Sequence, residues 1–387
     1  MNFDEPEHIG LIRDSLRRFV EREMPREAAR VWDLEDRLPS AIADRLAGLG
    51  VMGLTVPETY GGQGRDIHAA LAVIEELSKR SLALAVPYIM SAFYGGMNIL
   101  AAGSERQKRT LLPALAAGRM RFAYGLTEPD VGADLASVTT RAERRGERVI
   151  VNGRKRFCTG AAIADFIYTL VKSDPARGRH ENLSFVLVPP AAKGVTLERM
   201  DALGMRGGGI YEVILEDVEV PAENVVGEDA GWNRGWEMLA GPALDIERLE
   251  VAAMALGIAE AATADAWAYA QERRQFGKPI ASHQAVRHAL ADARTKLLAA
   301  RLVLYQAAWL ANRDQPCGIE SSMAKLFVCE SAEEVVLACQ RVMGAYGLVK
   351  GFDMERYARD ILLFPIVGGS SHIQLNNIAN RLGLPKA

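Results

Sequence analysis

The sequence predicts an α+β protein built from three regions, and three observations support this. Apolar residues recur at helical spacing through most of residues 1–120. Short runs with turn signals between them fill residues 121–230 and are typical of strands. Long helical patterns return over residues 231–387, with apolar stripes facing in two directions, as in bundles and subunit interfaces. We therefore expect an N-terminal helical domain, a middle antiparallel β domain and a C-terminal helical domain with these boundaries.

The N-terminal region begins with Ile9, Ile12, Leu16 and Phe19–Val20 at the spacing of one helix face. A loop is predicted at residues 56–62, where a proline and two glycines interrupt the pattern. Further helices are predicted over residues 66–78, 88–101 and 105–117. The second of these is apolar nearly all round, which indicates a buried helix.

The middle region is predicted to contain short strands joined by tight turns. The strands are expected at residues 139–144, 149–151, 154–158, 166–172, 183–188 and 212–215. Asn152-Gly153 favours a type I′ hairpin turn, because both residues tolerate positive φ, and Arg145-Gly146 marks another turn. Hairpin connections are too short for parallel crossovers, so an antiparallel sheet is predicted.

The C-terminal region is predicted to be helical again. Glycines and Pro242 at its start mark a loop before the first long helix. Helices are expected over residues 244–274, 284–312, 321–344, 354–363 and 371–381.

Composition narrows the classes of protein. A net charge of −3 gives no support to a nucleic-acid partner or an anionic membrane surface. The four cysteines have no metal-binding spacing, so we expect free thiols and no metal site. The N-terminus is too charged for a signal peptide, and no uninterrupted apolar run approaches the length of a membrane span. These features predict a cytoplasmic protein.

The segment at residues 124–134, Tyr-Gly-Leu-Thr-Glu-Pro-Asp-Val-Gly-Ala-Asp, follows an expected strand start. Thr127 offers a hydroxyl, Pro129 fixes a turn, and Gly132 lets backbone approach a ligand. This segment resembles the Thr-Glu-Pro motif of the acyl-CoA dehydrogenase family, and four further segments between residues 56 and 374 match that family in the same order. The resemblance implies a barrel-like middle domain, a C-terminal four-helix bundle, FAD as cofactor and assembly as a homotetramer.

The resemblance also assigns residues to FAD. They are Tyr124, Leu126, Thr127, Gly132, Ala133, Phe157, Thr159, Arg273, Gln275, Phe276, His283, Gln284, Gln340, Met343, Gly344, Ser370 and His372. Phe157 stands where the family has a ring-stacking tryptophan, and Ala133 replaces a family serine, which removes one hydroxyl contact. Ala345 replaces a family glycine, so close approach to the dinucleotide is less expected there.

The reaction of that family needs a base for the α proton of an acyl thioester, and a carboxylate in a dry pocket suits this role. Many members carry it in a C-terminal Tyr-Glu-Gly-Thr segment, but here Gly368 stands at that position. Another subgroup, resembling isovaleryl-CoA and long-chain acyl-CoA dehydrogenases, places it in Leu-Asp-Leu-Glu-Arg, and residues 244–248 read Leu-Asp-Ile-Glu-Arg. We therefore expect Glu247 to be the catalytic base.

Helix periodicity supports Glu247 in this role. It falls on the stripe of Val251, Met254 and Ile258, which is unexpected for an acid on a solvated face, although a plain helix charge is the alternative. Asp245 and Arg248 face each other three residues apart. The resemblance assigns substrate contacts to Ala133, Asp245, Arg248 and Gly369.

The expected function is FAD-dependent α,β-dehydrogenation of an acyl-CoA to the trans-2-enoyl-CoA, with electrons passing to an electron-transferring flavoprotein. The sequence leaves open a flavin-dependent enoyl-CoA reductase, a dehydrogenase of acyl carrier protein thioesters and a flavin monooxygenase. A non-catalytic DNA-binding relative should carry a basic surface or tail, and the net acidic chain argues against it.

Overall fold

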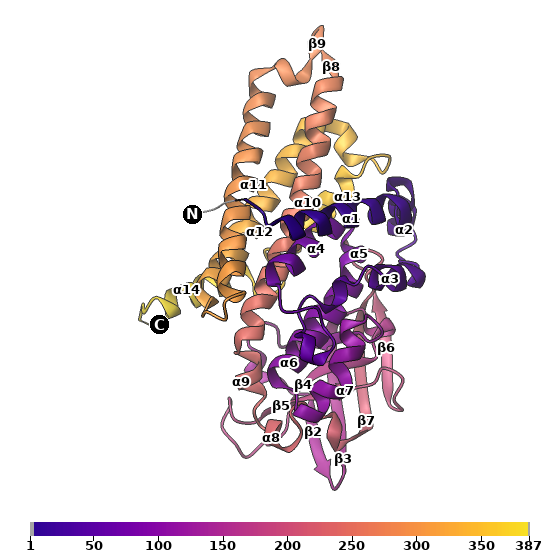
Figure 1. The fold of residues 1–387 in the computed structure, drawn as a ribbon, viewed down its shortest axis with the longest axis vertical. Coiled ribbons are helices and arrows are strands. Elements are labelled where there is room, and N and C mark those ends of the chain that lie inside the picture. Colours follow the sequence, from indigo (N-terminus) through magenta and orange to yellow (C-terminus); the bar gives the residue numbers. More distant parts are fainter. Residues whose placement is uncertain (1–3, 386–387) are drawn as a thin grey trace.

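The computed structural model describes residues 4–385 and shows helices above and around a sheet (Figure 1). The helices of the N-terminal region are α1 (Glu7–Glu23), α2 (Arg26–Leu34), α3 (Ser40–Ala47), α4 (Ile67–Arg80), α5 (Leu82–Ile89), α6 (Asn98–Ala102) and α7 (Glu105–Ala116). The predicted stripe of α1 is confirmed, because Ile9, Leu16 and Phe19 are all buried. α4 begins where the Asp66 side chain accepts a hydrogen bond from the amide of Ala69, as an N-cap residue should.

α5, a π-helical segment at Met90–Met97 and α6 form one helix, Leu82–Ala102. It begins six residues earlier than predicted, because its first turns are as apolar and buried as the rest. By length and composition it could cross a membrane, and so could Gly235–Glu272, although neither contains an uninterrupted apolar run of that length. The apolar windows of these helices are 94% and 72% buried inside the protein, as in core helices.

The middle region forms a seven-stranded sheet among the described residues. Its strands are β1 (Phe122–Gly125), β2 (Arg141–Arg145), β3 (Arg148–Thr159), β4 (Phe166–Lys172), β5 (Leu183–Val188), β6 (Val195–Met200) and β7 (Ile210–Pro221). The prediction of a purely antiparallel sheet is wrong, because β4 pairs in parallel with both β1 and β2. Long connections carry the chain between these strands. β6 was not predicted, since it is largely exposed and charged.

The predicted hairpin turn at Asn152-Gly153 is also wrong. β3 runs straight through both residues, and its pairing with β7 shifts register there. The Asn152 side chain donates to Asp217 Oδ1 at 3.0 Å and accepts from the Asp217 amide at 2.8 Å. Gly153 has φ 150°, and a Cβ there would lie 2.5 Å from Thr140 Oγ1. The glycine therefore serves a bulge and a close approach between strands.

The C-terminal region is the predicted set of helices, with bounds within three residues of those expected. They are α10 (Pro242–Glu272), α11 (Gln284–Ala311), α12 (Gly318–Met343), α13 (Met354–Ile361) and α14 (Ser371–Arg381). The small hairpin β8 (Arg274–Gln275) and β9 (Lys278–Pro279) joins α10 to α11 at the end of the molecule away from the large sheet (Figure 1). α10 extends from that hairpin toward the sheet and packs on both α12 and α4.

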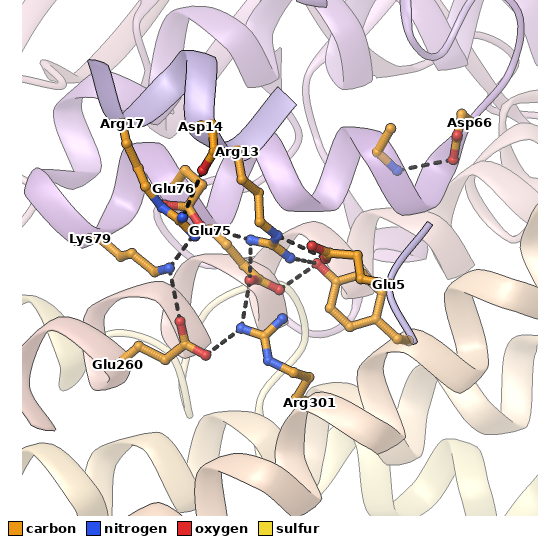
Figure 2. Close-up of polar contacts among 12 residues, drawn as sticks. Glu5, Arg13, Asp14, Arg17, Asp66, Glu75, Glu76, Lys79, Glu260 and Arg301 are labelled. Carbon is orange, nitrogen blue, oxygen red and sulfur yellow. Dashed lines mark hydrogen bonds and ion pairs between the residues drawn. The ribbon is translucent and has the colours of Figure 1, made fainter. Parts of the chain in front are cut away.

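A buried network of charges joins α1, α4, α10 and α11 (Figure 2). Arg13 of α1 donates to Glu75 Oε2 at 2.9 Å and Glu76 Oε1 at 3.0 Å, both on α4. Glu75 is fully buried and also accepts from Arg301 of α11 at 3.0 Å. Glu260 of α10 pairs with both Lys79 and Arg301. These helices are thus held in register by shared carboxylates.

Candidate active site

A recess of about 250 Å³, including its open mouth, lies where the Leu82–Ala102 helix, the sheet and the start of α10 meet. Its lining consists of Asn98, Tyr124, Leu126, Tyr168, Phe185, Met238, Leu239, Leu244 and Glu247. Aromatic and aliphatic side chains make up most of this set, and Glu247 is its acid. A mostly apolar recess with one carboxylate is a typical site for a small organic ligand.

The Glu247 carboxylate is held at this recess by a short chain of hydrogen bonds. The Tyr124 hydroxyl hydrogen-bonds Glu247, and the Asn98 amide donates to the same Tyr124 oxygen. Tyr94, from the π-helical segment, stacks on Tyr124 with ring centroids 4.0 Å apart. Burial raises the pKa of Glu247 to about 7, against the opposing effects of Arg248 and of the Tyr124 hydrogen bond. The carboxylate is therefore a stronger base than an exposed one.

The rest of α10 shows why Glu247 faces inward. Val251, Met254 and Ile258, on its own stripe, are all buried. Arg248 lies to the side, where it donates to Asp245, as the spacing of three predicts. Arg381 of α14 donates to the same Asp245 oxygen at 3.1 Å. The arginine next to Glu247 in sequence is therefore occupied by another carboxylate.

Gly368 lies close to the same turns of α10. Its φ is 62°, and a Cβ built on it would be 2.9 Å from Val251 Cγ2. Val251 is one helical turn beyond Glu247, so the two segments that could carry a base come together. The Gln374 side chain donates to the carbonyls of Gly368 and Gly369, which fixes this loop.

The segments around Thr127 and Phe157 also lie together. The Arg156 amide donates to the Thr127 carbonyl at 2.8 Å. The register of β3 against β7 shifts between Lys155 and Cys158, and within this bulge Phe157 has φ 59°. Phe157 is 58% exposed. A strained, exposed phenylalanine is costly unless it serves a ligand, so this bulge fits a planar group such as a flavin ring.

The bulge also contacts the helix that lines the recess. Gly160, with φ 74°, packs so tightly on Met90 that a Cβ would lie 2.3 Å from its sulfur. Thr159, just before it, is half-buried. In the loop after Thr127, Gly132 and Ala133 are exposed. Tyr124 and Leu126 thus line the recess, and Thr127, Phe157 and Thr159 lie on the segments that follow Leu126 or pair with its loop.

A buried ion pair that the sequence reasoning missed anchors the Thr127 loop. Lys155 Nζ donates to Glu128 Oε1 at 2.9 Å and to the Leu126 carbonyl at 3.1 Å. Glu128 also accepts from the amides of Thr139 and Thr140, at 2.7 and 2.8 Å. The Lys155 charge and these donors outweigh burial and lower the pKa of Glu128 to about 2. A lysine inside a strand pattern was the available signal.

Lys155→Met should destabilise the protein by about 3 kcal/mol, because it leaves the Glu128 carboxylate buried without its cation. It should also loosen the Thr127 loop and weaken retention of the FAD that the sequence leads us to expect, measured as FAD released on dilution. The exposed Lys193 provides a matched control, Lys193→Met, which should change neither. Equal unfolding temperatures and FAD retention in the two variants would show that the pair does not anchor the loop.

Most of the remaining residues assigned to FAD form a second group toward the end of the molecule that lies away from the large sheet (Figure 1). The Arg273 guanidinium lies 5.4 Å from the centre of the Tyr346 ring, beside the end of α12. Phe276, at the tip of the β8–β9 hairpin, has φ 52° and is 92% exposed. The residues of this group are Arg273, Gln275, Phe276, His283, Gln284, Gln340, Met343 and Gly344. Within a single chain, these residues do not lie beside Thr127 and Phe157.

The two remaining assigned residues lie at the start of α14. Ser370 caps this helix by accepting a hydrogen bond from the Ile373 amide. The next residue, Ser371, is half-buried, and His372 is exposed. Arg381 of this helix donates to Asp245, two residues before Glu247 on α10. Within residues 4–385, no group of three His, Cys, Asp or Glu side chains could hold a metal ion.

Comparisons with known proteins cover nearly the whole chain. Family models match the N-terminal domain of acyl-CoA dehydrogenases at residues 6–119, the middle domain at 123–218 and the C-terminal domain at 233–383. An acyl-CoA dehydrogenase of Bacillus subtilis (strain 168) is 36% identical over 365 residues, covering 94% of this chain and 95% of that protein.

A second relative and a solved structure extend the likeness. The caffeyl-CoA reductase-Etf complex subunit CarC of Acetobacterium woodii is 34% identical over 377 residues, covering 97% of this chain and 98% of that protein. The structure of butyryl-CoA dehydrogenase from Megasphaera elsdenii superposes with a TM-score of 0.94 at 29% identity, covering 99% of this chain and all of that one.

Proposed function

We propose that this chain, which belongs to the acyl-CoA dehydrogenase family, uses Glu247 to remove the α proton of an acyl-CoA during its oxidation to the trans-2-enoyl-CoA. The resemblance and the three-domain fold expected from the sequence are confirmed by these matches. The chain is an oxidoreductase, and flavin-dependent acyl-CoA oxidoreduction is the chemistry of its family. The substrate and the residue roles are our proposal.

The position of Glu247 is the observation that carries this proposal. Its carboxylate lies at an apolar recess, is oriented by Tyr124 and has a raised pKa. A base in such a place can take a weakly acidic α proton while water is kept out. The exposed, strained Phe157 and the anchored Thr127 loop beside the recess fit the ring system of FAD. Bound FAD supplies the acceptor for the β hydride.

The second group of assigned residues supports assembly from several copies. Arg273 offers a planar guanidinium suited to paired phosphate oxygens. It lies beside the exposed hairpin tip rather than near the Thr127 loop of its own chain. We therefore propose a homotetramer in which this end of one subunit reaches the FAD of another, and an electron-transferring flavoprotein as the electron acceptor.

The reverse reaction is a second candidate, favoured by the relative named as a caffeyl-CoA reductase subunit. The same carboxyl group can return a proton to the α carbon, because the two directions pass through one transition state. Flavin bleached by saturated acyl-CoAs indicates a dehydrogenase, whereas reduced flavin reoxidised only by enoyl-CoAs indicates a reductase.

The pH dependence of flavin reduction should report Glu247. The base must be ionised to accept a proton, and its folded-state pKa is raised to about 7. The rate of reduction by a saturating acyl thioester should therefore rise with pH and level off above about 7. A rate that is flat from pH 5 to 9 in stopped-flow measurements would contradict an ionising Glu247 as the base.

The purified protein should be yellow and release FAD on denaturation. Anaerobic addition of acyl thioesters that differ in chain length, branching and carrier should bleach its flavin, and the best substrate names the acyl class. A colourless protein that FAD does not reconstitute, or a flavin that no acyl or enoyl thioester affects, would overturn the proposed function.

A further inference from the structure

A second glutamate on α10 lies deeper than Glu247. Glu250 is fully buried, and neither of its carboxyl oxygens has a hydrogen-bond partner among residues 4–385. The Tyr88 hydroxyl, from the Leu82–Ala102 helix, is also fully buried and unpartnered in that range. Buried polar groups are nearly always paired, and leaving them unpaired costs free energy. These two groups therefore need a reason other than packing.

Glu250 lies on the same side of α10 as Glu247. Residues three apart share a helix face, and three residues correspond to a rise of ~4.5 Å along the axis. The charges of both carboxylates contribute, after burial, to the raised pKa values of Tyr94 and Tyr124, the stacked pair at the recess. Tyr88 lies six residues before Tyr94, on α5, which packs against α10. The unpaired groups therefore lie on the two helices, Leu82–Ala102 and α10, that both contribute residues to the lining of the recess.

The protonation of Glu250 limits what can bind there. Burial and the Glu247 charge raise the pKa of Glu250 well above that of an ordinary glutamate. A fully buried carboxyl group that has no partner in the described part of the chain and lies close to another carboxylate favours its neutral form, and Tyr88 is a neutral phenol. Each has one O–H donor and free acceptor lone pairs. A hydroxyl group offers the same combination of one donor and two acceptors.

Other chemical groups at the end of an acyl chain would fit less well between Glu250 and Tyr88. A carboxylate would bring a further negative charge toward Glu247. An ammonium group offers donors alone and would have to ionise Glu250 next to that same charge. An alkyl end would leave three polar oxygens unpaired.

We propose that Glu250 and Tyr88 form a polar end to the acyl pocket and select acyl thioesters with a hydroxyl group about one helical turn, ~5 Å, beyond the α carbon. This inference rests on the proposed function, since it names the substrate class of the Glu247 site. Glu250 is a specificity residue in this account and takes no part in proton abstraction from the α carbon.

Direct binding to the FAD-loaded protein tests this. In 3-thia-acyl-CoAs a sulfur replaces the β carbon, so no α,β double bond forms and binding is measured without turnover. The pair 5-hydroxy-3-thiapentanoyl-CoA and 3-thiahexanoyl-CoA differs only in a terminal hydroxyl against a methyl. By calorimetry, the wild type should bind the hydroxyl compound about tenfold more tightly. Glu250→Leu should abolish or reverse this preference, and Tyr88→Phe should reduce it.

Glu272→Gln, at the exposed end of the same helix, is the matched control and should keep the preference for the hydroxyl compound. Circular dichroism shows whether each variant folds. If Glu250→Leu does not fold, Tyr88→Phe, which removes only one oxygen, still tests the preference. Equal or tighter binding of the methyl compound by the wild type overturns the inference while leaving the proposed function intact. An amino analogue that binds more tightly than the hydroxyl compound also overturns it. If no thioester binds or alters the flavin, both proposals fail.

Discussion

Replacing Glu247 with glutamine should slow flavin reduction by the best acyl thioester roughly 100-fold or more, the usual contribution of a positioned base. Glutamine keeps the size of the side chain and a partner for the Tyr124 hydroxyl, so FAD content and thioester affinity should be unchanged. The rate is measured by anaerobic stopped-flow at saturating substrate. Glu272→Gln, at the exposed end of the same helix, is the control and should reduce its flavin normally.

The loop at Gly368 offers a test of the same geometry from the opposite side. Adding Gly368→Glu to Glu247→Gln places a carboxyl group in the segment that packs on Val251. Positive φ at Gly368 and the nearby Val251 side chain make this substitution strained, so only partial recovery of flavin reduction is expected. Near-wild-type reduction by Glu247→Gln alone would show that the base lies elsewhere.

The second large effect is expected at Arg13. Arg13→Met should lower stability by about 3–5 kcal/mol, because it removes one partner of a buried ion pair and leaves Glu75 with one fewer cation. The Tyr305 hydroxyl would also lose its contact with the guanidinium, which is 2.8 Å long. Urea unfolding followed by circular dichroism measures the shift in midpoint. The exposed Arg18 of the same helix gives the control, Arg18→Met.

An Arg13→Met midpoint equal to that of Arg18→Met would mean that the network in Figure 2 adds nothing to stability. Replacement of both partners of a buried ion pair is often neutral, because desolvation offsets their Coulomb attraction. The expected loss arises because the substitution removes only one partner and leaves the other charge buried.

Local signals predicted much of the fold. α14 and β5 have the predicted bounds, because a capping serine and a short, mostly apolar run define them within a few residues. The Asn152-Gly153 signal failed because its residues serve distant partners, Asp217 and Thr140, which no local pattern shows. The parallel pairing of β4 with β1 was missed for the same reason, since it depends on a long connection.

In the candidate site, too, local patterns predicted some features, and contacts between distant residues determined the others. Periodicity on α10 was enough to place Glu247 with Val251, Met254 and Ile258 on a buried stripe. The same spacing puts Glu250 on that stripe, but no local pattern shows that its carboxyl oxygens lack a hydrogen-bond partner among residues 4–385. The Lys155–Glu128 pair joins residues 27 apart in sequence, and only the sheet reveals it.

Exchange of the α hydrogens of a 3-thia-acyl-CoA with solvent tests the central claim most directly. This compound cannot be oxidised to an enoyl product, so exchange reports proton removal separately from hydride transfer. The ligand is deuterated at the α carbon, incubated with enzyme in ordinary water and followed by NMR. Wild-type protein should wash out one deuterium, and Glu247→Gln should do so at least about 100-fold more slowly. Exchange by Glu247→Gln at the wild-type rate would contradict Glu247 as the base.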